Sequence, residues 1–458
     1  MKTEFLIYGS SPNALCAALA LAKAGREVLL VETSRDFGAP YCSHDSGELG
    51  LAFAHLCPEL VQRFQLDAAF VCHPARAGLA PDGRWIRLTP EGLSGGARAR
   101  DGQRWGDFVA LMGQAARLYR GLEQSDAGVL QSWRDLGRRN STEVLRLPWT
   151  SLRDLLDEWF EDDLLKGVLA ETALEGIAQG PFACGTTFHL IRRWARNEVL
   201  QPQVAVGGSS KMMALLRRRA EEAGVRVVHE CGHPVLDLNE NVLTVEGLSL
   251  TFEILLSDRD VRWTYQQLIS PRYLETEFNV AVQRLRGRGI WTRALGDLAW
   301  PKGWLQELCK DVIHLQPGLF ALERCWDEVK RHRFPERAPT VLRWPAHLDA
   351  SLPADRVEIS LVYGGDPLSR MEGLAVDQLE LMTPADYERN WQCSQGHLWG
   401  GETDLSQSLW LRPFPDYEAE LSQVDLCGVS RPPADFSGRA GVWAAEHWLS
   451  KRGLAASY

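Results

Sequence analysis

The sequence has no two cysteines at C-x-x-C spacing, although 10 of its 458 residues are cysteines. It also has no cluster of His and Cys at the spacing of zinc ligands. We therefore expect no metal site, and buried or inert thiols in a reduced, cytoplasmic protein. A strand is predicted within the first eight residues, so we expect no cleavable leader peptide.

Long apolar runs and an excess of positive charge are lacking as well. No run of about 18 apolar residues occurs, so we expect no integral membrane segment. The formal net charge of -10 gives no electrostatic reason to bind nucleic acid. The length allows one to three domains, and the sequence shows no repeats. These properties favour a compact, multidomain enzyme.

The first 32 residues have the pattern of strand, turn, helix and strand. Residues 5–8 are apolar, an alanine-rich helix follows the turn, and residues 28–31 lead to Glu32. In an ADP-binding βαβ unit the turn faces the pyrophosphate and the acid faces a ribose. Of the three usual glycines only Gly9 remains, because Ser11 and Ala14 stand at the second and third positions. A βαβ unit that binds no nucleotide is the alternative.

Later segments continue an α/β pattern. Gly207 and Gly208 precede a helix predicted over residues 211–223, and a strand is predicted over 225–228. Two further strand candidates, 242–245 and 252–257, follow at hairpin spacing. The remaining expectations are a helical region over 99–139, a helix capped by Ser151 or Thr150, a half-buried strand over 358–363, a strand that begins at 424, and a helix over 438–450.

Five landmarks in collinear order carry a resemblance to a known family. They are the N-terminal unit through Glu32 and Gly38, residues 154–186, residues 207–258, residues 396–413, and residues 426–430. Together they resemble the phytoene-desaturase-like branch of the FAD-dependent amine oxidase superfamily, particularly the phytoene dehydrogenase-related oxidoreductases.

The resemblance implies an α/β fold with a discontinuous Rossmann-like FAD-binding domain and an inserted mixed α+β substrate domain. The FAD-binding pieces are expected at residues 1–95, 200–265 and 395–458. A helical insertion is expected at 96–199, and the main substrate domain at 266–394. In such proteins the flavin accepts a hydride, while the protein orients the substrate and excludes water.

The resemblance also assigns candidate residues. The ADP half of FAD is expected at Gly9, Ser11, Asn13, Ala14 and Glu32, with Gly38 beneath it. Glu32 is alternatively a solvated acid at a strand end. The other cofactor-binding candidates are Gly207, Gly208, Arg412, Cys427, Gly428 and Ser430.

His397 is the one candidate for a catalytic role, facing flavin or substrate. A packed structural histidine is the alternative. Arg412 could orient the flavin or form an ion pair between domains.

The glycine-rich segments of the family are eroded together in this chain. Ala39 follows Gly38 where Gly-Gly is usual, and residues 431–441 bring bulk and Asp435 to the C-terminal loop. Two hypotheses follow. The first is an FAD-dependent oxidoreductase acting on a small or amphipathic organic substrate. The second is a catalytically degenerate subunit that binds or stabilises a partner protein. The expected protein contacts are such a partner or a second copy of the chain in a homo-oligomer.

Overall fold

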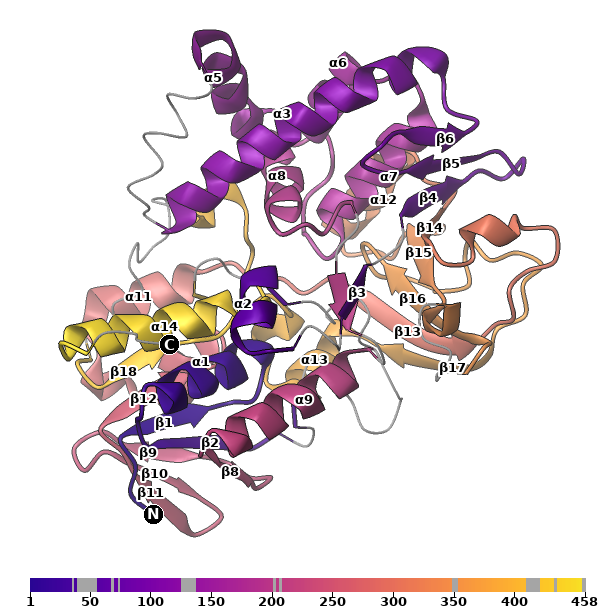
Figure 1. Cartoon of the computed structure of the whole chain (residues 1–458). Coiled ribbons are helices and arrows are strands. Elements are labelled where there is room, and N and C mark those ends of the chain that lie inside the picture. Colours follow the sequence, from indigo (N-terminus) through magenta and orange to yellow (C-terminus); the bar gives the residue numbers. More distant parts are fainter. Residues whose placement is uncertain are drawn as a thin grey trace.

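A five-stranded parallel sheet lies at one end of the molecule in the computed structural model (Figure 1). The structure describes residues 1–34, 37–38, 56–66, 70–72, 75–124, 137–200, 203–205, 208–347, 353–408, 421–431 and 435–454. The strand order is β18-β12-β1-β2-β8, and every neighbouring pair is parallel. The strands are β1 (Phe5–Tyr8), β2 (Val28–Glu32), β8 (Arg226–His229), β12 (Ile254–Ser257) and β18 (Val424–Leu426).

Helices cover one face of this sheet and a small sheet covers the other. Phe5, Ile7 and Leu30 pack with α1 (Pro12–Lys23), α9 (Gly208–Glu222) and α14 (Arg439–Lys451). Leu6 and Leu29 face the opposite side, in one apolar cluster with the antiparallel sheet β9 (Val235–Asp237), β10 (Val242–Val245) and β11 (Leu248–Thr251). β1 and β2 are therefore buried on both faces, which is why they are continuous apolar runs.

The hairpin expected between residues 242–245 and 252–257 is wrong in its second strand. β10 pairs with β11, whereas β12 runs in the parallel sheet beside β1. The predicted Rossmann-like α/β fold class is confirmed, and the strands of the parallel sheet come from the N-terminal, central and C-terminal parts of the chain.

The second large sheet has eight strands in the order β17-β13-β16-β15-β14-β4-β5-β6. Its strand β16 (Arg356–Leu361) was expected to be half-buried, yet residues 357–361 are all buried. The polar positions of β16 are covered by buried partners from other elements. The other strands are β4 (Arg76–Leu79), β5 (Trp85–Leu88), β6 (Leu93–Gly95), β13 (Thr292–Asp297), β14 (Val312–Leu315), β15 (Thr340–Arg343) and β17 (Asp377–Met382).

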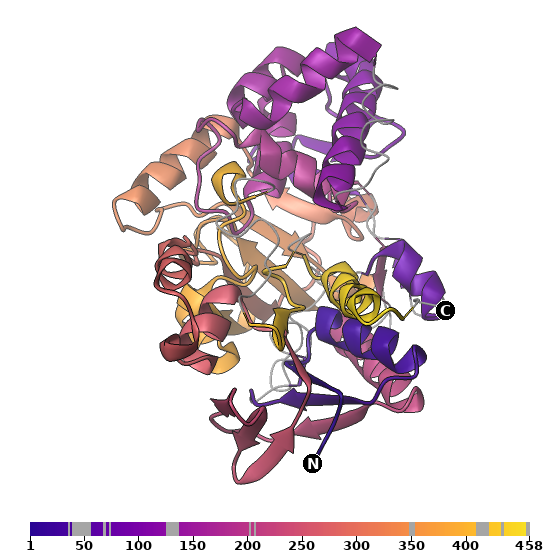
Figure 2. The same cartoon turned by 90° about the vertical axis from the view of Figure 1, so that its left-hand side faces the viewer.

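Helices pack at the end of the molecule opposite the parallel sheet in both views (Figures 1 and 2). The side chain of Ser151 accepts a hydrogen bond from Asp154 N, which confirms the predicted N-cap of α6. These helices are α3 (Ala99–Gln124), α5 (Gly137–Arg146), α6 (Leu152–Trp159), α7 (Asp163–Leu174) and α8 (Thr187–Ala195).

The remaining elements connect these layers. They are α2 (Pro58–Arg63), α10 (Val261–Trp263), α11 (Thr276–Arg284), α12 (Leu319–Lys330), α13 (Pro384–Trp391), β3 (Phe70–Cys72) and β7 (Gln203–Ala205). Residues 76–95, assigned above to the first nucleotide-binding piece, form β4 to β6 of the eight-stranded sheet. The other domain boundaries stay a prediction. In the part of the chain that the structure describes, no helix combines the length and apolarity needed to cross a membrane.

Candidate functional site

The turn between β1 and α1 lies at the carboxyl edge of the parallel sheet, where nucleotide sites form in such folds. Ser11 caps α1, and its Oγ accepts hydrogen bonds from Asn13 N and Ala14 N. Leu15 N donates to Ser11 O, and Pro12 has no N–H. The first-turn donors of α1, which usually receive a phosphate, are thus used inside the helix.

A carboxylate from a distant segment sits on this turn. Asp258 follows β12, and its two oxygens accept from Ser11 N, at 2.8 Å, and from Ser11 Oγ. A Cβ at Gly9 would lie 2.6 Å from Asp258 Cβ, and a Cβ at Gly428 would lie 2.2 Å from Asp258 O. Both glycines therefore make room for Asp258. The carboxylate occupies the position of an anion at the helix N-terminus.

Glu32 lies at the end of β2 as expected for a ribose-binding acid, and it is fully buried. Its carboxylate accepts from Ser10 Oγ, Thr33 N, Ser34 N and Ser34 Oγ. The guanidinium of Arg259 completes this shell with a buried ion pair. The alternative of a solvated strand-end acid is therefore wrong, because Glu32 has no exposure to solvent.

The pKa values follow from burial and from these partners. Burial alone would raise the pKa of Glu32, but Arg259 and the hydrogen bonds from Ser10 and Ser34 lower it. For Asp258 burial prevails over the hydrogen bonds from Ser11 and raises the pKa to about 7. Glu32 is thus held as a charged partner of Arg259, whereas Asp258 titrates near neutral pH.

The other ADP-half candidates have partners within the chain. Gly38 N donates to Ser10 Oγ at 2.7 Å, and Asn13 Nδ2 donates to Asp435 O at 2.7 Å. Ala14 N is one of the donors to Ser11 Oγ. Asp435, noted as an unusual acid in the C-terminal loop, thereby ties that loop to α1. The structure thus brings the N-terminal candidates close together, but their polar groups form hydrogen bonds with other residues of the chain.

We call the space between the β1–α1 turn, Glu32 and the segment after β12 the groove, and His397 is buried close to it. Gly401 N donates to His397 Nδ1 at 3.2 Å, so the neutral ring carries its proton on Nε2. Nε2 has no hydrogen-bond partner among the described residues, and burial lowers the pKa of His397 to about 4. A cavity of about 30 Å³ lies beside Ser11, Asp258 and His397. That volume suits one water molecule, and His397 is one of the residues that line the cavity.

The C-terminal candidates pack against the end of β12. Cys427 N donates to Ser257 O, and burial raises the pKa of the Cys427 thiol. Ser430 Oγ accepts from Val261 N at 3.0 Å and contacts Gly400 O. Ser430 therefore joins the loops after β12 and β18. Gly208 begins α9, and Gly207 and Arg412 lie outside the described residues.

Sequence reasoning missed Asp258 and Arg259 as site residues. Residues 256–258 were part of the family resemblance, but no role was assigned to their side chains. A signal was present, because an acid and a base directly follow the apolar run of β12. Their meaning depends on β12 lying beside β1, which the sequence did not predict.

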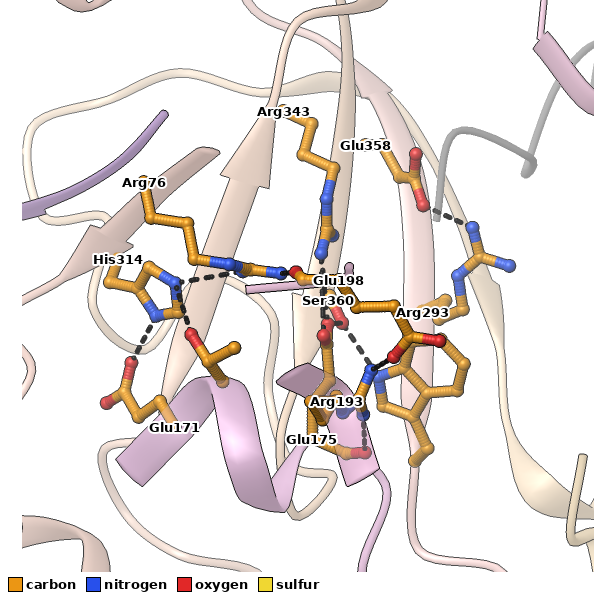
Figure 3. A network of polar contacts seen from close by, with 12 residues as sticks. Arg76, Glu171, Glu175, Arg193, Glu198, Arg293, His314, Arg343, Glu358 and Ser360 are labelled. Atoms are coloured by element: carbon orange, nitrogen blue, oxygen red, sulfur yellow. Dashed lines mark hydrogen bonds and ion pairs between the residues drawn. The ribbon is translucent and has the colours of Figure 1, made fainter. Parts of the chain in front are cut away.

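A second group of buried charges lies between α7, α8 and the eight-stranded sheet (Figure 3). Glu175, at the end of α7, pairs with Arg343 of β15 at 3.3 Å and accepts from Ser360 of β16. Burial alone would raise the pKa of Glu175, but Arg343, Arg193 and Arg76 lower it to about 2. The remaining labelled members are Glu171, Glu198, Arg293, His314 and Glu358.

This group connects helices to strands. Arg193 of α8 donates to Glu175 O at 2.8 Å and to Glu198 at 3.0 Å, and Arg76 of β4 donates to Glu198 O. His314 of β14 contacts Glu171 of α7 at 3.0 Å. The members are paired with one another, so we interpret the group as the polar contact that fixes the helical region on the sheet.

The chain is similar to known proteins in sequence and in fold. No protein-family model matches the chain. The chain is 24% identical over 386 residues to pyridine nucleotide-disulfide oxidoreductase domain-containing protein 2 from Rattus norvegicus. That alignment covers 69% of this chain and 63% of the relative, so the chain spans less than two thirds of the relative's length.

Solved structures match over nearly the whole chain. A putrescine oxidase with bound putrescine has a TM-score of 0.59 and 12% identity, covering 98% of this chain and 99% of its own. Cyclohexylamine oxidase from Brevibacterium oxydans IH-35A has a TM-score of 0.53 and 14% identity, covering 98% and 99%. At such identities the likeness shows the fold and not the reaction. The chain shares the fold of these two oxidase structures.

Proposed function

We propose that this protein is an FAD-dependent oxidoreductase of the amine oxidase superfamily, from its phytoene-desaturase-like branch. One observation carries the proposal. The N-terminus of α1, Glu32 at the end of β2 and Gly428 after β18 lie at one edge of a parallel sheet, where the family binds its dinucleotide.

The residues present do not fit the ADP half of FAD in the arrangement seen here. A pyrophosphate at α1 would meet the carboxylate of Asp258, and the ribose hydroxyls would have to replace Arg259 on Glu32. Cofactor binding at this groove therefore requires both side chains to move.

An apolar cavity supports an apolar or amphipathic substrate. It has a volume of about 170 Å³ and is lined by residues of α3, α5 and α8, including Leu118, Val144 and Ile191. The exposed Trp149 and Leu145 stand at its border with solvent. Such a cavity can take the apolar part of a molecule while leaving a polar end outside.

Anaerobic reduction of the flavin tests the proposed function. The purified protein is saturated with FAD and mixed with diamines, cyclic amines and apolar polyenes, because two structural neighbours oxidise amines. We expect one substrate class to bleach the visible band of the bound flavin, with the matching oxidised product formed. If none of these substrate classes reduces the flavin in protein saturated with FAD, the oxidoreductase proposal fails.

The competing hypothesis is a non-catalytic subunit. The observation in its favour is that Asp258 and Arg259 of the chain itself occupy the groove. The solved structures that share the fold, however, are enzymes. It gains support only if the protein stays without FAD and copurifies with an intact flavoprotein.

A further inference from the structure

Two adjacent side chains of this protein stand where two parts of one ligand would stand. Asp258 and Arg259 follow β12 at the carboxyl edge of the sheet, next to the turn of β1. Both are nearly fully buried, at 7% and 5% exposure. They face different anchor points of the nucleotide groove, one with a carboxyl group and the other with a guanidinium.

The first anchor point is the N-terminus of α1. A diphosphate binds there through backbone N–H groups and the positive end of the helix dipole. In this protein the carboxylate of Asp258 accepts a hydrogen bond from Ser11 N at 2.8 Å. Ser11 Oγ accepts hydrogen bonds from Asn13 N and Ala14 N. The N-terminus of α1 is therefore already occupied by a carboxyl group that belongs to the chain.

The second anchor point is Glu32. Its carboxylate would accept two ribose hydroxyls in a dinucleotide site. Here Arg259 reaches across the ring of Tyr8, with the guanidinium carbon 5.4 Å from the ring centroid, and forms a buried ion pair with Glu32. Removing a ligand from a buried carboxylate normally leaves an unpaired charge, and Arg259 prevents that.

We propose that Asp258 and Arg259 supply from within the chain the contacts that ADP would supply, and that they thereby set the affinity of this groove for FAD. The inference rests on the proposed function, because it concerns the same groove. The pair lets the protein fold without a nucleotide. FAD must displace the Asp258 carboxylate from α1 and compete with Arg259 for Glu32, so the wild-type chain binds it weakly.

Binding of ADP and of FAD, each measured with the whole purified chain, tests the proposal. We expect Asp258→Ala to bind both at least tenfold more tightly than the wild type, because the competing anion is gone. Asp258→Asn keeps the size of the side chain and removes its charge, so we expect a smaller gain. Thermal unfolding without nucleotide should occur at a lower temperature for Asp258→Ala, and saturating ADP should restore it.

Asp311→Ala is the matched control. Asp311 is also a buried aspartate whose pKa burial raises, to about 6, but its partner is Arg87. We expect that variant to lose stability without any change in nucleotide affinity. The proposal is overturned if neither Asp258 variant gains ADP affinity, if Asp311→Ala gains as much, or if both Asp258 variants stay unfolded in saturating ADP.

The two proposals fail separately. If Asp258→Ala gains ADP affinity but no substrate reduces bound flavin, the oxidoreductase function is wrong and the inference on the groove stands. If wild-type protein binds FAD tightly and the Asp258 variants do not change that affinity, the inference is wrong and the function stands.

Discussion

Gly9 is the glycine that a dinucleotide-binding turn would have, but in this protein it lies against Asp258. Its φ of +116° lies in the region that favours glycine, and a Cβ there would lie 2.9 Å from Asp258 Oδ2. In a dinucleotide site the turn makes room for a phosphate. In this protein Gly9 makes room for a carboxylate, so its survival is no evidence for a bound nucleotide.

Asp258 also predicts how stability depends on pH. Its pKa is raised from 3.8 to about 7 in the folded protein, so the folded state binds the proton more tightly than the unfolded state. Its contribution to stability is therefore present below pH 4 and is lost as the pH rises towards 7. The ionisable groups near it among the described residues include Glu32, Arg259, Cys393 and Cys427, together with Asp260 and His397, which line the same small cavity.

We expect the free energy of unfolding of wild type to fall, relative to that of Asp258→Asn, between about pH 4 and pH 7. Urea unfolding at several pH values measures the difference. Parallel pH profiles for the two proteins would show that Asp258 keeps an ordinary pKa.

The sequence predicted the place of the groove but not what fills it. Gly9, Ser11 and Glu32 lie within one local unit, so a strand-turn-helix-strand pattern was enough to position them. Asp258 is 247 residues from Ser11 along the chain, and only the pairing of β12 with β1 brings the two side chains together. Local patterns carry no information on that pairing.

At the scale of elements, α1 and α14 cross in close contact beside the groove. A Cβ on Gly441 would lie 1.8 Å from Asn13 O, so the two helices meet backbone to backbone. The crossing holds the C-terminal helix over the start of α1, beside the cap at Ser11. Small residues at such a crossing permit the close approach that larger side chains prevent.

Substitution of Gly441 tests this packing. We expect Gly441→Ala to lower the free energy of unfolding by about 1–3 kcal/mol, because the added methyl group forces the helices apart. Gly113→Ala in α3 is the control, since a Cβ there meets no atom within 4 Å. That variant should gain roughly 0.5–1 kcal/mol from helix propensity. Equal effects of both substitutions in chemical unfolding would contradict the account.

Element boundaries were predictable where a local signal exists. Ser151 caps α6, β18 begins at Val424, and α14 begins within one residue of its predicted start. The partner of β10 was not predictable, because β11 is a short alternating strand, β12 is a short apolar one, and spacing alone does not show which of them pairs with β10.

At the scale of the whole molecule, the buried charges of Figure 3 connect the helical end to the eight-stranded sheet. Glu171 and Glu175 are four residues apart at the end of α7, and both are buried. That spacing of acids in an otherwise apolar helix was a usable sequence signal. The arginine partners of Glu175 come from β15, α8 and β4, and Glu171 pairs with Arg370, so the sequence did not reveal which charges these acids neutralise.

We expect Glu175→Gln to lower the free energy of unfolding by about 3–5 kcal/mol, because it leaves Arg343 buried without its charge partner. Since the pKa of Glu175 is lowered to about 2, its contribution is present above pH 4.5 and is lost as the pH falls towards 2. Asp157→Asn breaks a more exposed pair with Lys166 and should cost about 0–1 kcal/mol. Equal losses of stability in urea unfolding would contradict this account, because the buried pair would then contribute no more than the exposed one.

The central claim is that Asp258 and Arg259 occupy the places of the ADP diphosphate and ribose. A structure from crystals of the wild-type protein grown in saturating ADP tests it most directly. The account predicts a diphosphate at the N-terminus of α1, with the Asp258 carboxylate turned away from Ser11 and Arg259 withdrawn from Glu32. Density for ADP at that position with both of these contacts intact would contradict it.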